Sequence, residues 1–124
     1  MSVARQRTGR VGEALAARIL ERRGYRLLAR NPRTRAGEID VVALDGGILA
    51  FVEVKTMRTG ARSGPERPAL AVGPSKQLQI RRLARAWLSE NDPPRYEGMR
   101  FDVIGLLIDP ADRPVSVELI QDAF

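Results

Sequence analysis

Gly37-Glu38-Ile39-Asp40 and Phe51-Val52-Glu53-Val54-Lys55 are the two stretches that decide the fold of this chain. Both read as strands, and the side chains of a strand alternate between the two faces of a sheet. Glu53 and Lys55 therefore share one face of the second strand, while Asp40 lies on one face of the first. The two stretches predict a sheet that carries two carboxylates and one ammonium group.

A glycine turn between the stretches sets which side chains face each other. If Gly46-Gly47 is a two-residue hairpin loop, Asp45 pairs with Ile48. Counting outward from that pair places Asp40 opposite Glu53 on the same face. A slip of one residue would place the two carboxylates on opposite faces. We therefore predict the first register, in which the two acids lie close together.

Two adjacent carboxylates call for a cation between them. Like charges about 5 Å apart repel by roughly 1 kcal/mol in water and by several times more in a partly buried site. The chain contains no cysteine and no histidine, which excludes a disulfide scaffold, a cysteine nucleophile, a serine–histidine triad and the usual zinc ligands. We therefore predict a metal ion held by oxygen atoms at Asp40 and Glu53.

The distribution of basic residues singles out Lys55. Lys55 and Lys76 are the only lysines among 21 basic residues, and the others are all arginine. A lysine in such a chain indicates a position that needs a compact, deprotonable ammonium group in place of a planar guanidinium group. The alternative is that each lysine is an ordinary surface charge.

Length and composition predict one domain spanning residues 1–124. With 124 residues and 44% hydrophobic content, the chain has room for a single modest core. The net charge of +6 and the isoelectric point near 10.9 favour a polyanionic partner, either nucleic acid or an anionic membrane surface. No apolar run is long enough to span a bilayer, and the first residues lack a secretory signal. We therefore expect a cytoplasmic protein that does not cross a membrane.

Two helices are predicted, one over residues 9–23 and one from an N-cap at Ser75 as far as Pro93. The phase of the first helix allows Glu13 to face either the sheet or solvent, and we favour the sheet. In the second helix, Lys76 extends the apolar stripe toward the N-terminus, so its ammonium group should project toward the sheet. We expect Glu13 and Lys76 to converge on the same pocket.

The turn at residues 31–37 contains two arginines, Arg33 and Arg35. Asn31 and Arg33 directly precede the strand that leads to the first carboxylate. We consider two roles for them, contact with a nucleic-acid backbone and capping of the turn. Together with Lys76, these turn residues are candidates for binding nucleic acid.

A longer connection runs from Thr56 to Pro74 and is rich in glycine, proline and arginine. It shows no clear hydrophobic periodicity, and it is longer than the loops that usually connect elements of a compact domain without a function of their own. We expect a poorly ordered, substrate-binding loop that presents Arg58 and Arg62. The alternative is a flexible insertion without a binding role.

The order of the predicted elements is helix, three strands, helix, two strands. The last two strands are expected at about residues 100–108 and 115–121, and a crossover between strands of one sheet should be parallel and right-handed. We therefore predict an α/β fold with a mixed sheet of about five strands flanked by helices. Arg100 and Asp102 share a face of the fourth strand, where we expect a structural ion pair in preference to direct catalysis.

The chain resembles the PD-(D/E)xK nuclease superfamily, which shares the restriction-endonuclease-like fold. Asp40, Glu53 and Lys55 match the D…ExK signature, with Ile39 in the position of the proline. More narrowly, the chain from about residue 8 to 104 resembles the small bacterial YraN-like family. That resemblance rests on Gly12-Glu13, Ala17, Gly24-Tyr25, Asn31, Arg33, Gly37-Glu38-Ile39-Asp40, Phe51-Val52-Glu53-Val54-Lys55, Lys76 and Arg100-Phe101-Asp102.

The resemblance implies an endonuclease that depends on Mg²⁺ or Mn²⁺ and hydrolyses phosphodiester bonds in DNA. The metal ligands that it implies are Asp40, Glu53, the Val54 carbonyl and, through water, Glu13. The catalytic residues that it implies are Glu13, Asp40, Glu53, Lys55 and Lys76. Lys55 would orient the attacking water and offset charge in the transition state, and Lys76 would steady a neighbouring phosphate.

The YraN-like family also resembles archaeal Holliday-junction resolvases, in which a glutamate of the first helix, here Glu13, joins the D…ExK set. This likeness implies branched or structured DNA as the substrate, in repair or recombination, and a symmetric homodimer. No sequence-reading helix or zinc finger is evident, so recognition should depend on DNA structure. Two alternatives stay open, a nucleic-acid-binding module without turnover and a subunit of a larger nucleoprotein assembly.

Overall fold

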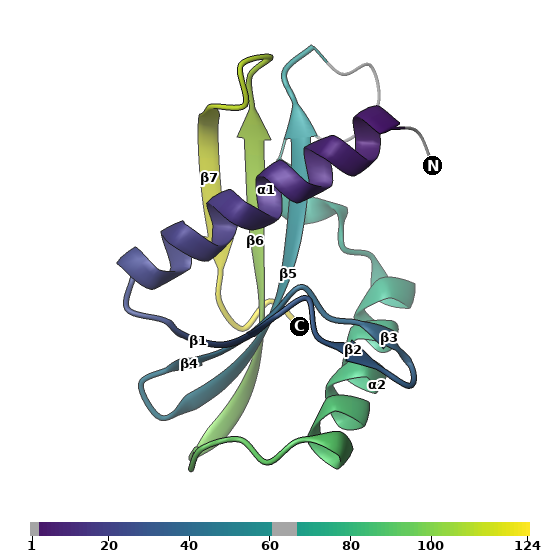
Figure 1. Ribbon diagram of the computed structural model, residues 1–124, viewed down its shortest axis with the longest axis vertical. Coiled ribbons are helices and arrows are strands. Elements are labelled where there is room, and N and C mark those ends of the chain that lie inside the picture. Colours follow the sequence, from purple (N-terminus) through teal and green to yellow (C-terminus); the bar gives the residue numbers. More distant parts are fainter. Residues whose placement is uncertain (1–2, 61–66) are drawn as a thin grey trace.

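A five-stranded mixed sheet forms the middle layer of the structure, a computed structural model that describes residues 3–60 and 67–124 (Figure 1). In spatial order its strands are β1 (Arg26–Arg30), β4 (Val41–Asp45), β5 (Ile48–Arg58), β6 (Gly98–Ile108) and β7 (Pro114–Ile120). The pair β5–β6 is parallel, and the other neighbouring pairs are antiparallel. This arrangement confirms the predicted α/β class with a mixed sheet of about five strands.

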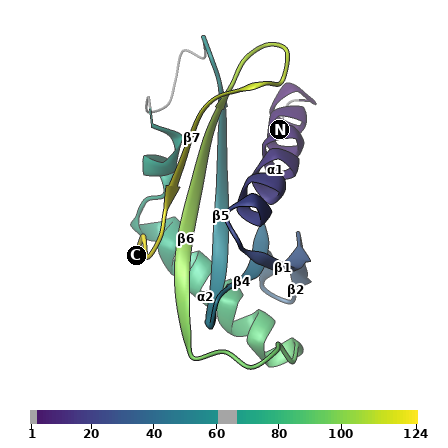
Figure 2. The same cartoon turned by 90° about the vertical axis from the view of Figure 1, so that its left-hand side faces the viewer.

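Helices cover both faces of this sheet. α1 (Val3–Arg22) crosses one face, and α2 (Pro74–Glu90) lies with the short 3-10 helix η1 (Pro68–Ala71) on the other, as the side view in Figure 2 shows. Among residues 3–60 and 67–124, no helix is both long and apolar enough to cross a membrane. The sheet is thus the middle of three layers.

Each face of the sheet has its own cluster of buried apolar side chains. On the α1 side, Ala16 and Leu20 pack against strand residues that include Val52. On the α2 side, the ring of Trp87 meets the ring of Phe51 edge-on, with 5.9 Å between the centroids. Side chains of β5 alternate between the two clusters, so its odd-numbered residues face α2 and its even-numbered residues face α1.

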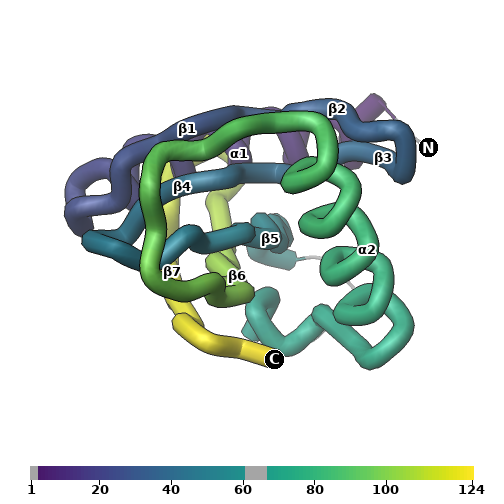
Figure 3. The backbone as a smooth tube through the Cα atoms, turned by 90° about the horizontal axis from the view of Figure 1, so that it is seen from below, coloured from purple at the N-terminus to yellow at the C-terminus, as the bar shows by residue number. Residues whose placement is uncertain are grey.

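A small two-stranded arm replaces the predicted turn at residues 31–37. It consists of β2 (Arg33–Thr34) and β3 (Gly37–Glu38), which pair with each other and lie beside α2 (Figure 3). The stretch from Gly37 to Asp40 is therefore divided between two elements, since β3 ends at Glu38 and β4 begins at Val41. Asp40 lies in the link between them and outside any strand, where the sequence predicted a strand residue.

Both helices begin at other residues than predicted. α1 starts at Val3 because the residues before Gly9 contain no helix breaker, so the helix extends further toward the N-terminus. α2 is capped by Gly73, and the prediction of an N-cap at Ser75 is wrong. Pro74 takes the first helical position, where its missing N–H group is no loss because that group has no partner within the helix.

The predicted loop from Thr56 to Pro74 is ordered at both ends. β5 continues to Arg58 because its backbone pairs with β6 as far as Ile108. At the other end, Pro68 and Ala69 of η1 are buried on the sheet. The expectation of a long disordered loop is therefore wrong for these parts, and residues 61–66, which include Arg62, lie outside the described residues.

Candidate active site

The hairpin of β4 and β5 brings two carboxyl groups together. Asp45 pairs with Ile48, as a two-residue turn requires, and the ladder ends one residue short of Asp40 and Glu53. The carboxyl groups of Asp40 and Glu53 lie close enough together for each to shift the pKa of the other. The predicted register is confirmed.

Part of the edge of β5 is open at this point. Pairing with β4 ends at Val52, whereas pairing with β6 continues to Arg58, so within the described residues no strand lies beside Glu53 to Arg58 on the β4 side. Asp40 turns onto this edge, and its Oδ2 accepts a hydrogen bond of 2.8 Å from the Val54 N–H. The N–H and C=O of one strand residue point to the same side, so the Val54 carbonyl is also directed toward this edge.

Burial and mutual repulsion disfavour charge on the two acids. Burial, followed by the charge of Asp40, raises the pKa of Glu53 to about 7, against the lowering effect of Lys76 and Lys55. Burial also raises the pKa of Asp40, although the Val54 N–H lowers it. A pair of carboxylates in this state would be stabilised by a cation that binds both.

Lys76 and Lys55 supply positive charge next to the pair. Lys76 projects from the first turn of α2, and its Nζ lies 3.6 Å from Glu53 Oε1. This contact confirms that Lys76 points toward the sheet. Lys55 follows Glu53 on the same face of β5, close enough for its charge to lower the pKa of Glu53.

Glu13 reaches the site from the α1 side of the sheet. Glu13 lines a groove together with Val54 and Lys55. Burial, then the charges of Asp40 and Glu38, raise the pKa of Glu13. Among the residues that the structure describes, however, no three acidic, histidine or cysteine side chains are grouped tightly enough to bind one metal ion. Glu13 is thus not placed as a direct ligand beside Asp40 and Glu53, and its water-mediated role stays a prediction.

Glu13 and Lys76 approach from opposite faces of the sheet. Lys76 stands on α2 and contacts Glu53, whereas Glu13 stands on α1 and lines a groove with Lys55. The sequence predicted that Glu13 and Lys76 would share one pocket. They instead flank the Asp40–Glu53 pair because the open edge of β5 is accessible from both layers.

Asn31 has a positioning role that the sequence did not indicate. Its backbone N–H donates to the Asp40 carbonyl at 2.9 Å. Its amide, oriented with nitrogen toward the acids, donates to Glu13 Oε2 at 3.1 Å and to Glu38 Oε1 at 3.2 Å. Asn31 therefore links the acid of α1 to the carboxylate pair, and its left-handed φ of 51° is a conformation that asparagine tolerates well.

Gly12 allows α1 to approach β5 closely enough for Glu13 to reach the site. A Cβ atom at this position would lie 1.7 Å from Thr56 Oγ1 and 2.6 Å from Thr56 Cβ. Such distances cannot be relieved without moving the helix or the strand. Gly9, one turn earlier on the same helix, provides a matched control, because a Cβ atom added there would have no neighbouring atom within 4 Å.

We expect Gly12→Ala to lower the free energy of unfolding by about 1–3 kcal/mol, because the added methyl group overfills the contact with Thr56. Any catalytic activity should fall with it, because Glu13 moves with the helix. Gly9→Ala should raise stability by about 0.5–1 kcal/mol through the lower entropy of the unfolded chain. Chemical denaturation of both variants measures the difference, and equal stabilisation by both would contradict the close contact.

Two of the predicted nucleic-acid-binding residues, Arg33 and Arg35, contact other side chains. Arg33 is 78% exposed and lies 4.0 Å from Glu38 across the arm. The Arg35 side chain donates to Ser89 Oγ at 2.9 Å, near the end of α2 that lies about 20 Å along the helix from Lys76. Neither contact prevents binding of phosphates, but Arg35 is too far from Lys76 to act at the same phosphate.

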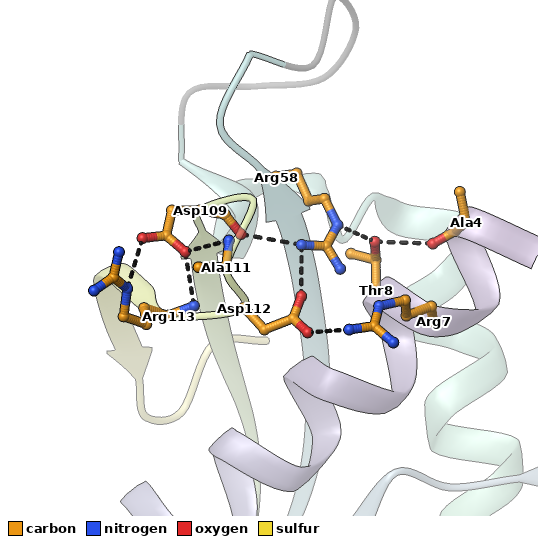
Figure 4. A network of polar contacts seen from close by, with 8 residues as sticks. All are labelled: Ala4, Arg7, Thr8, Arg58, Asp109, Ala111, Asp112 and Arg113. Carbon is orange, nitrogen blue, oxygen red and sulfur yellow. Dashed lines mark hydrogen bonds and ion pairs between the residues drawn. The ribbon is translucent and has the colours of Figure 1, made fainter.

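Arg58 is part of a polar network that joins three elements (Figure 4). Its Nε donates to Thr8 Oγ1 at 2.8 Å, and its Nη1 donates to the Asp109 carbonyl at 3.0 Å. The same guanidinium group forms an ion pair of 2.8 Å with Asp112, which also binds Arg7. Arg58 therefore joins β5, α1 and the β6–β7 turn, and its predicted contact with DNA stays a prediction.

Arg100 and Asp102 form the predicted structural ion pair. Arg100 donates from Nε and Nη2 to the two carboxylate oxygens of Asp102, at 2.8 and 2.9 Å. Asp102 is fully buried and also accepts hydrogen bonds from the Tyr25 hydroxyl at 2.7 Å and the Asp122 N–H at 3.0 Å. Arg100 further donates to Asp45 at 2.8 Å. Every oxygen of Asp102 is thus committed to a structural network.

The relatives of this chain agree with its motifs. Residues 12–106 match the family described as "Uncharacterised protein family UPF0102". The chain is 48% identical over 113 residues to a UPF0102 protein of Streptomyces griseus, covering 91% of this chain and 92% of that protein. It is 50% identical over 113 residues to a UPF0102 protein of Geobacter sulfurreducens (91% and 84% covered) and 46% identical over 121 residues to one of Symbiobacterium thermophilum (96% and 97% covered). The chain therefore belongs to the UPF0102 family, the YraN-like family that its motifs indicated.

Proposed function

We propose that this protein is a metal-dependent endonuclease that hydrolyses phosphodiester bonds in branched or structured DNA. The observation that carries the proposal is the grouping of Asp40, Glu53 and Lys76 at the open edge of β5, where the Val54 N–H donates to Asp40 Oδ2 at 2.8 Å and Lys76 Nζ lies 3.6 Å from Glu53 Oε1. The site also agrees with the D…ExK signature of the PD-(D/E)xK resemblance. A symmetric homodimer is part of the same proposal.

The donor atoms at this edge fit Mg²⁺ or Mn²⁺. Asp40 and Glu53 offer two carboxylates and Val54 one carbonyl, and hard cations of this size prefer oxygen ligands while keeping several waters. When bound, such an ion lowers the pKa of a coordinated water and polarises a phosphoryl oxygen. The raised pKa of Glu53 is consistent with a carboxylate whose natural partner is a cation.

The side chains around the pair have separate tasks in this proposal. Lys55, on the same face as Glu53, places an ammonium group where negative charge develops on the phosphoryl oxygens, and it can orient the attacking water. Lys76 holds a phosphate next to the scissile bond. Asn31 keeps Glu13 directed toward the pair, so that Glu13 can accept a hydrogen bond from a water of the metal shell.

A direct test incubates the purified protein with labelled four-way junctions, flaps, duplexes and single strands in Mg²⁺, Mn²⁺ or EDTA. We expect cleavage of at least one branched substrate that requires the metal. Sedimentation of the same preparation tests the dimer. Binding of DNA without cleavage of any substrate would favour the binding module over the endonuclease.

We expect Lys55→Arg to reduce the cleavage rate by about tenfold or more, because a guanidinium group is bulkier, planar and never deprotonated. DNA affinity and its salt dependence should change little, since the charge is kept. Single-turnover rates and binding isotherms separate the two effects. A variant that cleaves at the wild-type rate would show that the site needs only a positive charge.

A further inference from the structure

A groove of about 1160 Å³ runs along the open edge of β5 as far as Val54, whose N–H donates a hydrogen bond to Asp40. Its outer wall is the N-terminal half of α1, which contributes Arg5, Gln6 and Arg10. Its inner wall is β5, which contributes Lys55 and Thr56. Glu13 is the last residue of α1 that lines it, so the cations of α1 lead along the helix toward the acidic site.

The chemistry of this groove suits a phosphate backbone. Its walls offer guanidinium, ammonium, amide and hydroxyl donors, which are the groups that contact phosphate oxygens. None of the described residues that line it is aromatic, so it has no surface on which bases would stack. The groove should therefore bind nucleic acid through its backbone and without sequence preference.

The dimensions of the groove favour one strand. From Arg5 to Glu13 the axis of α1 advances by about 12 Å, a length that fits only a few nucleotides of one strand. The cations that line the groove among the described residues are Arg5 and Arg10 of α1 and Lys55 and Arg58 of β5, on its two walls. A duplex, which has two backbones, could contact only its rim.

The outer wall is held in place by polar contacts. Between Val3 and Arg10, the structure shows no buried side chain, so this part of α1 has little core packing. Arg58 fastens it through the hydrogen bond to Thr8, and Asp112 joins Arg58 to Arg7 (Figure 4). The groove is therefore formed before any ligand binds.

We propose that this groove binds the phosphate backbone of a single DNA strand, with a phosphate contact at Arg10, and guides that strand to Asp40 and Glu53. Arg10 is exposed, and no ion pair or hydrogen bond engages its side chain among the described residues. The identity of the anion as DNA rests on the proposed function, whereas the position of the binding surface does not. The substrate class becomes DNA with a single-stranded arm, a flap or a frayed junction.

The test measures binding of a fluorescent single-stranded oligonucleotide, and of a duplex of the same length, in EDTA at several salt concentrations. Arg10→Ala is compared with Arg85→Ala, which removes the same charge from the exposed outer side of α2. We expect Arg10→Ala to weaken single-strand binding several-fold and to reduce the salt slope by about 0.7. Arg85→Ala should match the wild type, and duplex binding should be weaker for all three proteins.

The results separate this inference from the proposed function, because binding in EDTA involves no turnover. If Arg10→Ala and Arg85→Ala lose the same amount of strand affinity, the effect depends only on net charge and the groove proposal is wrong. Displacement of the oligonucleotide by polyglutamate at equal charge concentration would also contradict a phosphate-binding groove. If the wild-type protein cleaves DNA but Arg10→Ala does not weaken strand binding, the proposed binding groove is wrong and the endonuclease proposal stands. If Arg10→Ala weakens strand binding but the wild-type protein cleaves no DNA, the endonuclease proposal is wrong and the groove stands.

Discussion

Replacing Glu53 by glutamine should reduce metal-dependent DNA cleavage by about 100-fold or more and leave DNA affinity unchanged or higher. Glutamine keeps the shape of the side chain but removes a metal-binding charge, and a bound metal ion contributes several kcal/mol to such a reaction. It also removes one of the two negative charges that repel phosphates at the edge of β5. Single-turnover cleavage in Mn²⁺ and binding in EDTA measure the two effects.

Glu118→Gln is the matched control for this experiment. Glu118 lies on β7 in an exposed ion pair with Arg67, so the same change of group there should alter neither cleavage nor affinity. Thermal unfolding in EDTA should show that Glu53→Gln is folded and at least as stable as the wild type, because it removes a buried acid whose pKa is raised. Cleavage by Glu53→Gln at the wild-type rate would contradict the assignment of Glu53 as a metal ligand.

Replacing Asp102 by asparagine should lower the free energy of unfolding by about 3–5 kcal/mol. The fully buried carboxylate accepts hydrogen bonds from Arg100, Tyr25 and the Asp122 N–H. In the asparagine variant the amide NH₂ group would face one or more of these donors and could not accept their hydrogen bonds. Domains of this kind are stable by only about 5–15 kcal/mol, so this loss is a large share of the total. Urea unfolding followed by the fluorescence of the single, buried Trp87 measures it.

Glu118→Gln again provides the comparison, since its partner Arg67 is 57% exposed. An exposed ion pair contributes about 0–1 kcal/mol, so this variant should unfold at nearly the wild-type urea concentration. The contrast tests whether burial determines the contribution of each carboxylate. Similar midpoints for Asp102→Asn and Glu118→Gln would show that the Arg100–Asp102 network is not structural.

Local rules predicted the centre of the site. The Gly46-Gly47 turn fixes the pairing of Asp45 with Ile48, and counting outward from that pair places Asp40 and Glu53 next to each other just beyond the last pair, Val41 and Val52. Helical phase likewise directed Lys76 toward the sheet. These predictions held because each depends on residues near one another in the chain, whose geometry is set by a single turn or helix.

Predictions that depended on distant parts of the chain were less accurate. Arg58 read as part of an arginine-rich loop, but the parallel partner strand β6 extends β5 through that residue, and the β6–β7 turn supplies Asp112 as its partner. The arm of β2 and β3 was read as a turn because its strands are two residues each and rest on α2. Asn31 was interpreted as a turn-capping or phosphate-contacting residue because its partner Glu13 lies on α1, far away in the sequence.

By itself, the sequence indicated the family through its motifs, and its short-range periodicity and glycine turn determined the α/β class and the register of the hairpin. Three features were decided only by the tertiary structure. β5 extends beyond the end of its pairing with β4, Asn31 connects Glu13 to the Asp40 segment, and α1 forms a groove along the open edge of β5. Each of these depends on packing between elements far apart in the chain. The physical reason is that strand pairing and helix contacts across the sheet depend on the final positions of both partners, which a local pattern does not contain.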